Sequence, residues 1–519
     1  MLVPRILAGI ACFSLSACMV GPDYKDPVAP LAPHWTHKDA SVRETTFCDG
    51  TWWHVFRDPA LTAVINQGYQ SNLSLLSAGV RVLQARAQLA QSVGELYPQQ
   101  QVMTGNYTYN RLGGSSLQGL LPQKFDTALM GFNASWELDF WGKYRRAIQS
   151  NNASFLASAA AYDNALITLT ADIATTYIKI RTTEAQIRVT KSNIGVQAIG
   201  LRIAKSRFKA GQTSQVDVAQ AQTELTQTQA SLPPLVATLQ RQKDALAVLL
   251  GTAPNGADAL LKQNHGIPKA PRTVAVGIPK ETLMRRPDIY QAREEAIAQS
   301  AAIGAAKANL YPALSLSGTF AFTSNNIGSS SISDIFNWSS RYVTAGPGVN
   351  WPILNYGQIT NAVRAQDAVF QQALLSYVNL ILKAQQEVQD NITGYVQAKQ
   401  AEYYLIKANA SAIQSLKLAL IRYKEGETDF TPVLNAEQQQ LQVQTSLINA
   451  QGDIPQAMVA LYRSLGGGWE IRRGNDIIPD VMKAEMAART NWGGLLKPQE
   501  HQPGVTRREK LKQLYLPKW

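Results

Sequence analysis

The residues with the most distinctive chemistry stand at the end of an apolar leader. Residues 1–17 carry one early positive charge, Arg5, and then an apolar run over residues 6–15. This pattern is typical of a secretory signal peptide, and the run is too short for a helix that stays in a bilayer. The leader ends in Leu15-Ser16-Ala17-Cys18, which has the form of a bacterial lipobox. We therefore predict a lipoprotein signal peptide at residues 1–17 and a covalent lipid on Cys18.

A lipid on Cys18 would anchor the mature chain. The thiol takes a diacylglycerol and the freed amine takes a third acyl chain, and each buried methylene adds about 0.8 kcal/mol of membrane affinity. Met19 follows in place of aspartate, which by analogy with enteric lipoproteins favours the outer membrane. The alternative is an ordinary secreted protein with a stray cysteine near its cleavage site. Because Cys12 leaves with the leader, Cys48 has no partner and we expect no disulfide.

Catalytic and metal-binding motifs are missing from the sequence. It has no phosphate-binding glycine-rich loop with Lys-Ser/Thr, no nucleophile elbow and no zinc-protease histidine motif. Its five histidines form no cluster with cysteines or carboxylates. The net charge of +12 is spread along the chain rather than gathered in a stripe with interleaved aromatic residues. We predict no enzyme, no metal, no nucleic-acid partner and no cofactor other than the lipid.

Several sequence segments of the chain occur in two copies. Residues 136–142 (WELDFWG) return as residues 351–357 (WPILNYG), and residues 208–213 (FKAGQT) return as residues 423–428 (YKEGET). The offset, about 215 residues, is too long for a solenoid unit. The sequence therefore predicts a duplicated half-protein, and its function must suit two similar halves.

Two long segments, residues 143–210 and 358–425, contain no proline. At about 1.5 Å per residue each predicts a helical rod of roughly 100 Å, which demands a coiled coil or a helical barrel. In the first rod, apolar residues recur at every seventh position, namely Leu166, Ile173, Ile180, Ile187, Ile194, Leu201 and Phe208. The companion row from Leu169 to Ala204 is less apolar, so we expect it to meet water. A plain coiled-coil spacer is the alternative.

Each rod ends in a tip from which a second helix returns. A glycine follows each rod as a C-cap, Gly211 or Gly426, and a threonine two residues later can cap the next helix. We predict return helices at residues 214–250 and 429–465. Prolines inside both of them should kink or break them. Shorter helices are expected at about residues 59–95 and 281–309.

Between the short helices and the rods the hydrophobic period changes to two residues. Strands are predicted at residues 99–112, 127–141, 313–324 and 341–355. Alternation over roughly ten residues, with aromatic residues near the ends, is typical of membrane barrels; an amphipathic hairpin on a soluble sheet is the alternative. Four strands cannot close alone in lipid, so the barrel must close between chains. Two chains give eight strands, which side chains fill, and three chains give twelve strands with room for a pore. If the protein serves as a conduit, three chains are favoured.

With these motifs the chain resembles the TolC/OprM-type outer-membrane efflux channel family, in the lipidated (NodT-like) branch of RND tripartite efflux systems. The motifs that carry the resemblance are Cys18 with residues 21–24 (GPDY), residues 286–289 (RPDI), the two Tyr-Pro-to-strand junctions, and residues 136–142, 208–218 and 465–469. Together they cover about residues 18–470.

The resemblance implies an α+β membrane protein with an internal two-fold repeat. A homotrimer would form one twelve-stranded β-barrel, four strands per chain, continued by a long α-helical coiled-coil barrel. It would sit lipid-anchored in the outer membrane, extend into the periplasm, and carry drugs or other toxic small molecules outward as a passive duct. Its partners would be a periplasmic membrane-fusion adaptor and an inner-membrane RND-type pump. A type I protein-secretion duct and a structural periplasm-spanning lipoprotein are the alternatives.

The resemblance also implies a periplasmic gate at the second tip. The candidates are Asp429, Thr431, Asn435 and Gln438. A family aspartate falls on Asn435 and a nearby arginine position falls on Gln438, so this chain departs from the usual charged ring. Asp429 is the remaining acidic candidate, with a simple N-cap role as the alternative, and Asp217 at the first tip has the same two alternatives.

The predicted organisation follows from these assignments. It comprises the signal peptide 1–17, a lipid-anchored extended segment 18–57, the first repeat 58–251, a linker or equatorial segment 252–280, the second repeat 281–469 and a C-terminal equatorial or tail segment 470–519. Each repeat contains a helix, two strands, a rod (143–210 or 358–425) and a return helix.

Overall fold

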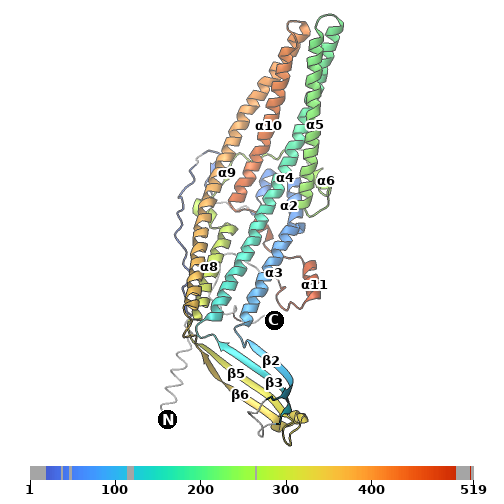
Figure 1. Cartoon of the computed structure of the whole chain (residues 1–519). Helices are drawn as coiled ribbons and strands as arrows, with labels where there is room; N and C mark the ends of the chain where they lie inside the picture. The colour runs from blue at the N-terminus through green and yellow to red at the C-terminus, as the bar shows by residue number, and fades with distance from the viewer. Residues whose placement is uncertain are drawn as a thin grey trace.

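The computed structural model describes residues 19–36, 39–45, 50–113, 122–262, 266–497 and 515. The predicted lipidation site Cys18 and the two other cysteines lie outside the described residues. The chain is elongated (Figure 1). Its long helices run from a four-stranded sheet at one end to two helix–turn–helix tips at the other. Within the described ranges, no helix has the length and apolar character that a membrane crossing requires.

Four helices form the long part of the molecule. The rods are α4 (Lys143–Lys209) and α9 (Gln358–Glu425), and the return helices are α5 (Gln215–Leu249) and α10 (Thr431–Ser464). Each rod starts directly after a glycine in the left-handed conformation, with φ of 78° and 84°, a conformation that glycine adopts without a steric penalty. Basic residues occupy the last turn of both rods, where they complement the helix dipole.

The apolar heptad row of α4 is buried along most of its length. Leu166, Ile173 and Ile180 are fully buried, and only Phe208 at the tip is exposed. The companion row is buried as well, including Thr183, Thr190 and Gln197, so the expectation that this row meets water was wrong. The reason is that α4 packs against α3, α5, α8 and α10, and this central position excludes water from both rows.

The prolines do not break the return helices. Helix α5 continues through Pro233 and Pro234, and α10 continues through Pro455. A proline inside a helix frees the carbonyl four residues earlier. In α5 these carbonyls belong to the exposed residues Gln229 and Ala230, so water can satisfy them.

The shorter helices are each divided in two. Helices α2 (Pro59–Ser71) and α3 (Leu73–Gly94) meet at Asn72, whose side chain accepts a hydrogen bond from the Leu75 amide at 2.8 Å. In the second half, α7 (Pro279–Leu283) precedes α8 (Pro287–Ala308), which starts at a proline as helix first turns often do.

The four long strands form one antiparallel sheet. They are β2 (Gln100–Arg111), β3 (Lys124–Leu138), β5 (Ala313–Asn325) and β6 (Arg341–Asn350), in the order β2-β3-β5-β6. The two hairpins pair through β3 and β5, with Phe132 opposite Phe320. Among the described residues, strands β2 and β6 are therefore open edges of the sheet. Large apolar side chains are exposed on the sheet, among them Met103, Tyr107, Phe132, Phe320 and Val343.

Smaller elements precede, connect or follow the long ones along the chain. They are β1 (Val42–Arg43), which pairs in parallel with β4 (Val274–Ala275), the 3-10 helices η1 (Trp52–Phe56) and η4 (Trp469–Arg472), and the helices α6 (Asp258–Leu261) and α11 (Asp480–Arg489). Two further 3-10 turns, η2 (Ile332–Phe336) and η3 (Trp338–Ser340), lie between β5 and β6. Trp52 and Trp53 are fully buried here and contact each other edge to face.

Candidate functional site

The predicted gate residues lie at the helical tip, at the end of the molecule opposite the sheet (Figure 1). Asp429, Thr431, Asn435 and Gln438 are all exposed. The carboxylate of Asp429 accepts a hydrogen bond from the Thr431 amide at 3.2 Å, so it satisfies a free donor at the start of α10. The structure brings Gln438 to the other half of the chain, because its side-chain amide donates to Glu224 of α5 at 2.9 Å.

Asp217 occupies a different environment from its counterpart Asp429. It lies in the first turn of α5, where a negative charge is favoured by the helix dipole. Its side chain is buried and accepts a hydrogen bond from the Thr213 hydroxyl. Asp217 therefore stabilises the turn between α4 and α5, whereas Asp429 remains accessible to solvent.

Arg207 and Tyr423 link the two halves at the tip, a contact that the sequence did not predict. The Arg207 guanidinium carbon of α4 lies 4.7 Å from the ring centroid of Tyr423 in α9. The same guanidinium donates a hydrogen bond to the Tyr423 carbonyl. The Tyr423 ring is fully buried and packs edge-on against Phe430, with centroids 5.2 Å apart. The one available sequence signal was the repeated aromatic residue at the start of both tip motifs.

A buried pair of carboxylates lies near the tip and was also missed. Glu224 of α5 and Glu437 of α10 are both buried. Burial, and then the neighbouring Glu224, raise the pKa of Glu437 to about 7. The sequence did contain a signal, because Glu437 shares one helical stripe with the buried residues Val433, Ala436 and Gln440.

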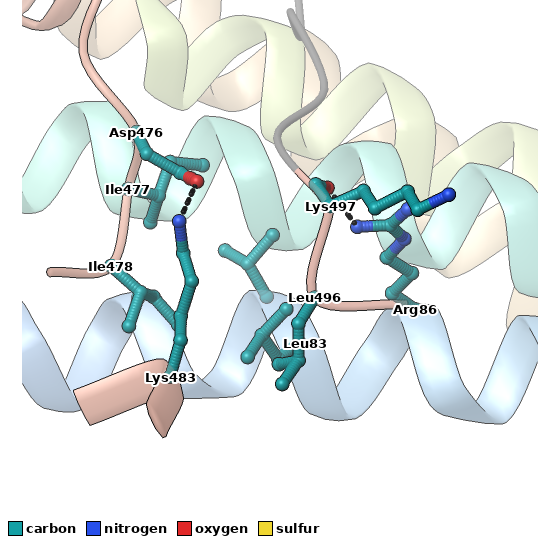
Figure 2. Close-up of a pocket in the computed structure, with 10 residues that line it drawn as sticks. Leu83, Arg86, Asp476, Ile477, Ile478, Lys483, Leu496 and Lys497 are labelled. Carbon is teal, nitrogen blue, oxygen red and sulfur yellow. Dashed lines mark hydrogen bonds and ion pairs between the residues drawn. The ribbon is translucent and has the colours of Figure 1, made fainter. Parts of the chain in front are cut away.

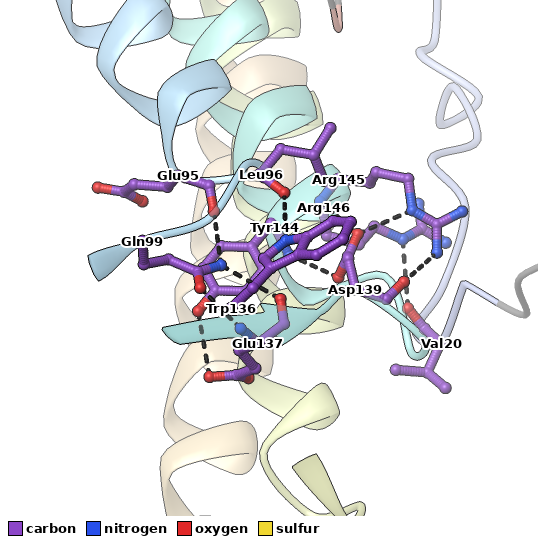
Figure 3. A network of polar contacts seen from close by, with 10 residues as sticks. All are labelled: Val20, Glu95, Leu96, Gln99, Trp136, Glu137, Asp139, Tyr144, Arg145 and Arg146. Atoms are coloured by element: carbon purple, nitrogen blue, oxygen red, sulfur yellow. Dashed lines mark hydrogen bonds and ion pairs between the residues drawn. The ribbon is translucent and has the colours of Figure 1, made fainter. Parts of the chain in front are cut away.

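The junction between sheet and rods is fixed by the first copy of the repeated motif (Figure 3). The Trp136 indole donates to the Leu96 carbonyl at 3.1 Å. Asp139 accepts hydrogen bonds from the backbone amides of Tyr144 and Arg145, each at 3.0 Å, and from the Arg145 side chain at 2.8 Å. Its carboxylate thus satisfies free donors in the first turn of α4. This arrangement turns the chain from strand to rod.

The N-terminal segment starts at this same junction. The Val20 amide donates to the Trp141 carbonyl at 3.1 Å, and Arg146 donates to the Val20 carbonyl at 3.2 Å. Met19 lies against Gly142, where a side chain would collide with it. From there the segment follows α8 and α9 through an Asp26–Arg293 ion pair at 2.7 Å and further hydrogen bonds. Met19 and Val20 are therefore tied to the end of the rods that meets the sheet.

Arg286, in the RPDI motif, joins three helices. It lies directly before α8 and is buried. It donates to Asp288 at 2.7 Å, to Glu387 of α9 at 2.9 Å and to the Ser464 carbonyl at the end of α10 at 2.6 Å. The motif therefore stabilises the packing of the second half.

The described parts of the chain hold no group of three or more His, Cys, Asp or Glu side chains that suits a metal ion. A cavity of about 30 Å³ lies where the segment around Ile477 covers α3 (Figure 2). Asp476 pairs with Lys483 beside it, and Arg86 donates to the Lys497 carbonyl at 3.0 Å. This volume has room for about one water molecule, so the cavity belongs to the packing of the C-terminal segment.

Comparisons with known proteins agree with this geometry. The family model described as "Outer membrane efflux protein" matches residues 64–252 and 278–467, and each matched segment contains one copy of the repeated landmarks. The chain is 28% identical over 466 residues to Nodulation protein T of Rhizobium leguminosarum bv. viciae, covering 90% of this chain and 94% of that protein. It is 29% identical over 478 residues to the toluene efflux pump outer membrane protein TtgI of Pseudomonas putida, covering 90% and 99%.

Solved structures show the same fold. The outer-membrane channel OprN superposes with a TM-score of 0.80 at 29% identity, covering 87% of this chain and 100% of that one. The CmeC outer membrane channel of Campylobacter jejuni superposes with a TM-score of 0.78 at 21% identity, covering 92% and 99%.

Proposed function

Because the chain belongs to the outer membrane efflux protein family, and is therefore an outer-membrane efflux channel rather than an enzyme, we propose that three copies form a passive exit duct. The duct consists of a shared twelve-stranded β-barrel and a helical barrel made from the rods. Each chain contributes two similar halves, so three chains form a tube with sixfold pseudo-symmetry.

The observation that carries this proposal is the open four-stranded sheet. Strands β2 and β6 each leave one edge without a partner in the described part of the chain, and apolar side chains are exposed on the sheet. Unpaired strand edges are not tolerated in lipid, so the sheet must continue into other copies. Twelve strands leave room for a pore, whereas eight strands are filled by side chains. A structural spacer would need no such sheet.

The proposed partners are a periplasmic membrane-fusion adaptor and an inner-membrane RND-type pump, which supplies the energy. At about 1.5 Å per residue, the 67 residues of α4 give a rod of roughly 100 Å that reaches far from the membrane. The proposed cargo is drugs or other toxic small molecules. Support comes from relatives whose names state solvent and toluene efflux. Other relatives are named for cation efflux and for pyoverdine export.

The proposed anchor is a lipid on Cys18. Met19 packs at the junction of sheet and rods, so acyl chains on the preceding residue could enter the inner leaflet beside the barrel. Three acyl chains would hold firmly, at about 0.8 kcal/mol for each buried methylene.

The proposed gate is the tip that contains Asp429, Thr431, Asn435 and Gln438. Three of these four side chains are neutral and polar and all four are exposed in the single chain. They can therefore form a ring around the threefold axis that closes by hydrogen bonds rather than by charge.

Two measurements test this function. Native mass spectrometry of the detergent-purified protein should give three chains per particle, and a monomer or dimer would contradict the duct. Deletion of the gene should increase susceptibility to several unrelated toxic compounds, and re-expression with its adaptor and pump should restore resistance. Unchanged susceptibility to every compound tested, including metal cations, would contradict the efflux role.

A further inference from the structure

Three helices enclose a pair of carboxylates about two to three turns below the tip. Glu437 of α10 faces α4 at Gly200, where a methyl group would lie 3.2 Å from its Oε1 atom. Glu224 of α5 lies beside it and also contacts Gln438 of α10. Exposed fractions of 4% for Glu224 and 2% for Glu437 show that a single chain already buries both carboxylates.

The two carboxylates differ in their partners. Glu224 accepts hydrogen bonds from the side-chain amides of Gln438 at 2.9 Å and Gln197 at 3.4 Å. Glu437 Oε1 is buried without a hydrogen-bond partner among the described residues. Donors favour the charged form of a carboxyl group, whereas burial and a like charge favour the neutral form. A proton shared by this pair therefore resides on Glu437.

Among the described residues, no cation compensates the pair. The basic residues Arg202 and Lys205 of α4 and Lys417 of α9 are exposed, and Glu224 is the charged group that contributes to the shift at Glu437. The groups of α4 that contact the pair are the neutral residues Gln197 and Gly200. Two adjacent buried negative charges would repel each other across the contact between α10 and its neighbours.

We propose that Glu224 and Glu437 form a proton-binding site that clamps α10 onto α4 and α5 near the tip. One bound proton holds the clamp tight, and loss of that proton loosens it. The site regulates the gate region, and in that respect the proposal rests on the proposed function. Its binding step is a property of the folded chain and can be measured without transport.

The pH range follows from the direction of the shift. The pKa of Glu437 rises from the ordinary glutamate value of 4.5 to about 7 on folding. The folded state then binds more protons than the unfolded state between these values, so this group's contribution to stability falls as pH rises through that range. The clamp is tight below about pH 5 and loosest above about pH 8.

Thermal unfolding of the purified full-length protein at about pH 5 and about pH 9 tests the site. The variant Glu437→Gln should unfold at the same temperature as wild type at the lower pH and at a higher temperature at the upper pH. Glu224→Gln should also reduce the difference in unfolding temperature between the two pH values, because it removes the like charge beside Glu437. Glu425→Gln, an exposed carboxylate at the same tip, is the matched control and should follow wild type.

The proposal would be overturned if the unfolding temperature of Glu437→Gln changed with pH as much as that of wild type. It would also be overturned if both pair variants unfolded at lower temperatures than wild type at both pH values. Failure of Glu437→Gln to assemble would also overturn it, because there the amide replaces a carboxyl group that the proposal holds neutral. These outcomes are independent of drug susceptibility, which tests the efflux role. For the gate, Glu437→Gln channels in bilayers should open less than wild type at the upper pH.

Discussion

The guanidinium carbon of Arg207 lies 4.7 Å from the ring centroid of Tyr423, so one cation–π contact joins the first and second halves of the chain at the tip. The two residues are 216 positions apart and also share a hydrogen bond. Since α4 and α9 belong to different halves, a change that separates the halves at this end must break this contact.

Arg207→Ala should loosen the tip. It removes a cation–π contact of about 0.5–2 kcal/mol, and the expected result is a higher open probability of single channels in planar bilayers. Arg202→Ala, on the exposed side of the same helix, is the control and should behave as wild type. Equal open probability for the two variants would show that the contact does not hold the tip closed.

Substitutions in the proposed gate should also open the pore. Asp429→Ala removes the hydrogen bond at the start of α10, and Asn435→Ala removes an exposed amide from the proposed ring. Both should raise single-channel conductance. Ile194→Val, a conservative change of about 0.5–1.5 kcal/mol in α4 about four turns before the tip, should leave conductance as it is. If neither tip substitution changes the single-channel conductance, the gate lies elsewhere.

Cys18→Ser should abolish acylation without removing the protein from the membrane. The four strands are an anchor that does not depend on lipid, so part of the assembled trimer should persist in the outer-membrane fraction. Mass spectrometry of the mature N-terminus reports the acyl chains, and membrane fractionation reports the trimer. If the variant is found in the soluble fraction alone, the barrel is not an independent anchor.

Arg472→Ala should destabilise the chain strongly. Arg472 pairs with Asp163 of α4 in a buried contact, with one hydrogen bond of 2.8 Å. Burial raises the pKa of Asp163 and the Arg472 side chain opposes this shift. Removing one partner of a buried pair lowers the free energy of unfolding by about 3–5 kcal/mol. The measurement is the unfolding temperature, which should fall. The neighbouring exposed Arg473→Ala should cost much less, and similar losses for both would rule out a special role for the pair.

Local patterns in the sequence were enough to predict the main elements. The seven-residue period from Leu166 to Leu201 corresponds to a mostly buried row of α4. The two-residue period around Phe132 and Phe320 corresponds to the paired strands β3 and β5. The family and the channel function followed from motifs such as residues 286–289. These features depend on residues that are close in sequence, so their spacing carries the information.

Other features depend on which helices become neighbours, and the sequence alone did not determine these. The companion row of α4 looked exposed because it contains Thr190 and Gln197, yet both side chains are buried where α4 packs against other helices. The prolines of α5 looked disruptive because the solvation of the freed carbonyls was unknown. Gln438 was predicted as part of the second tip, but its contact with Glu224 joins different halves.

The sequence by itself determined the repeat, the rods, the strands and the position of the tips, since each depends on a period or a cap within a few residues. The tertiary structure alone decided how the tips are held. Arg207 meets Tyr423, and Glu437 meets Glu224, because the two halves fold side by side. Contacts between residues so far apart leave no local period, and burial of a charge becomes visible once the surrounding helices are in place.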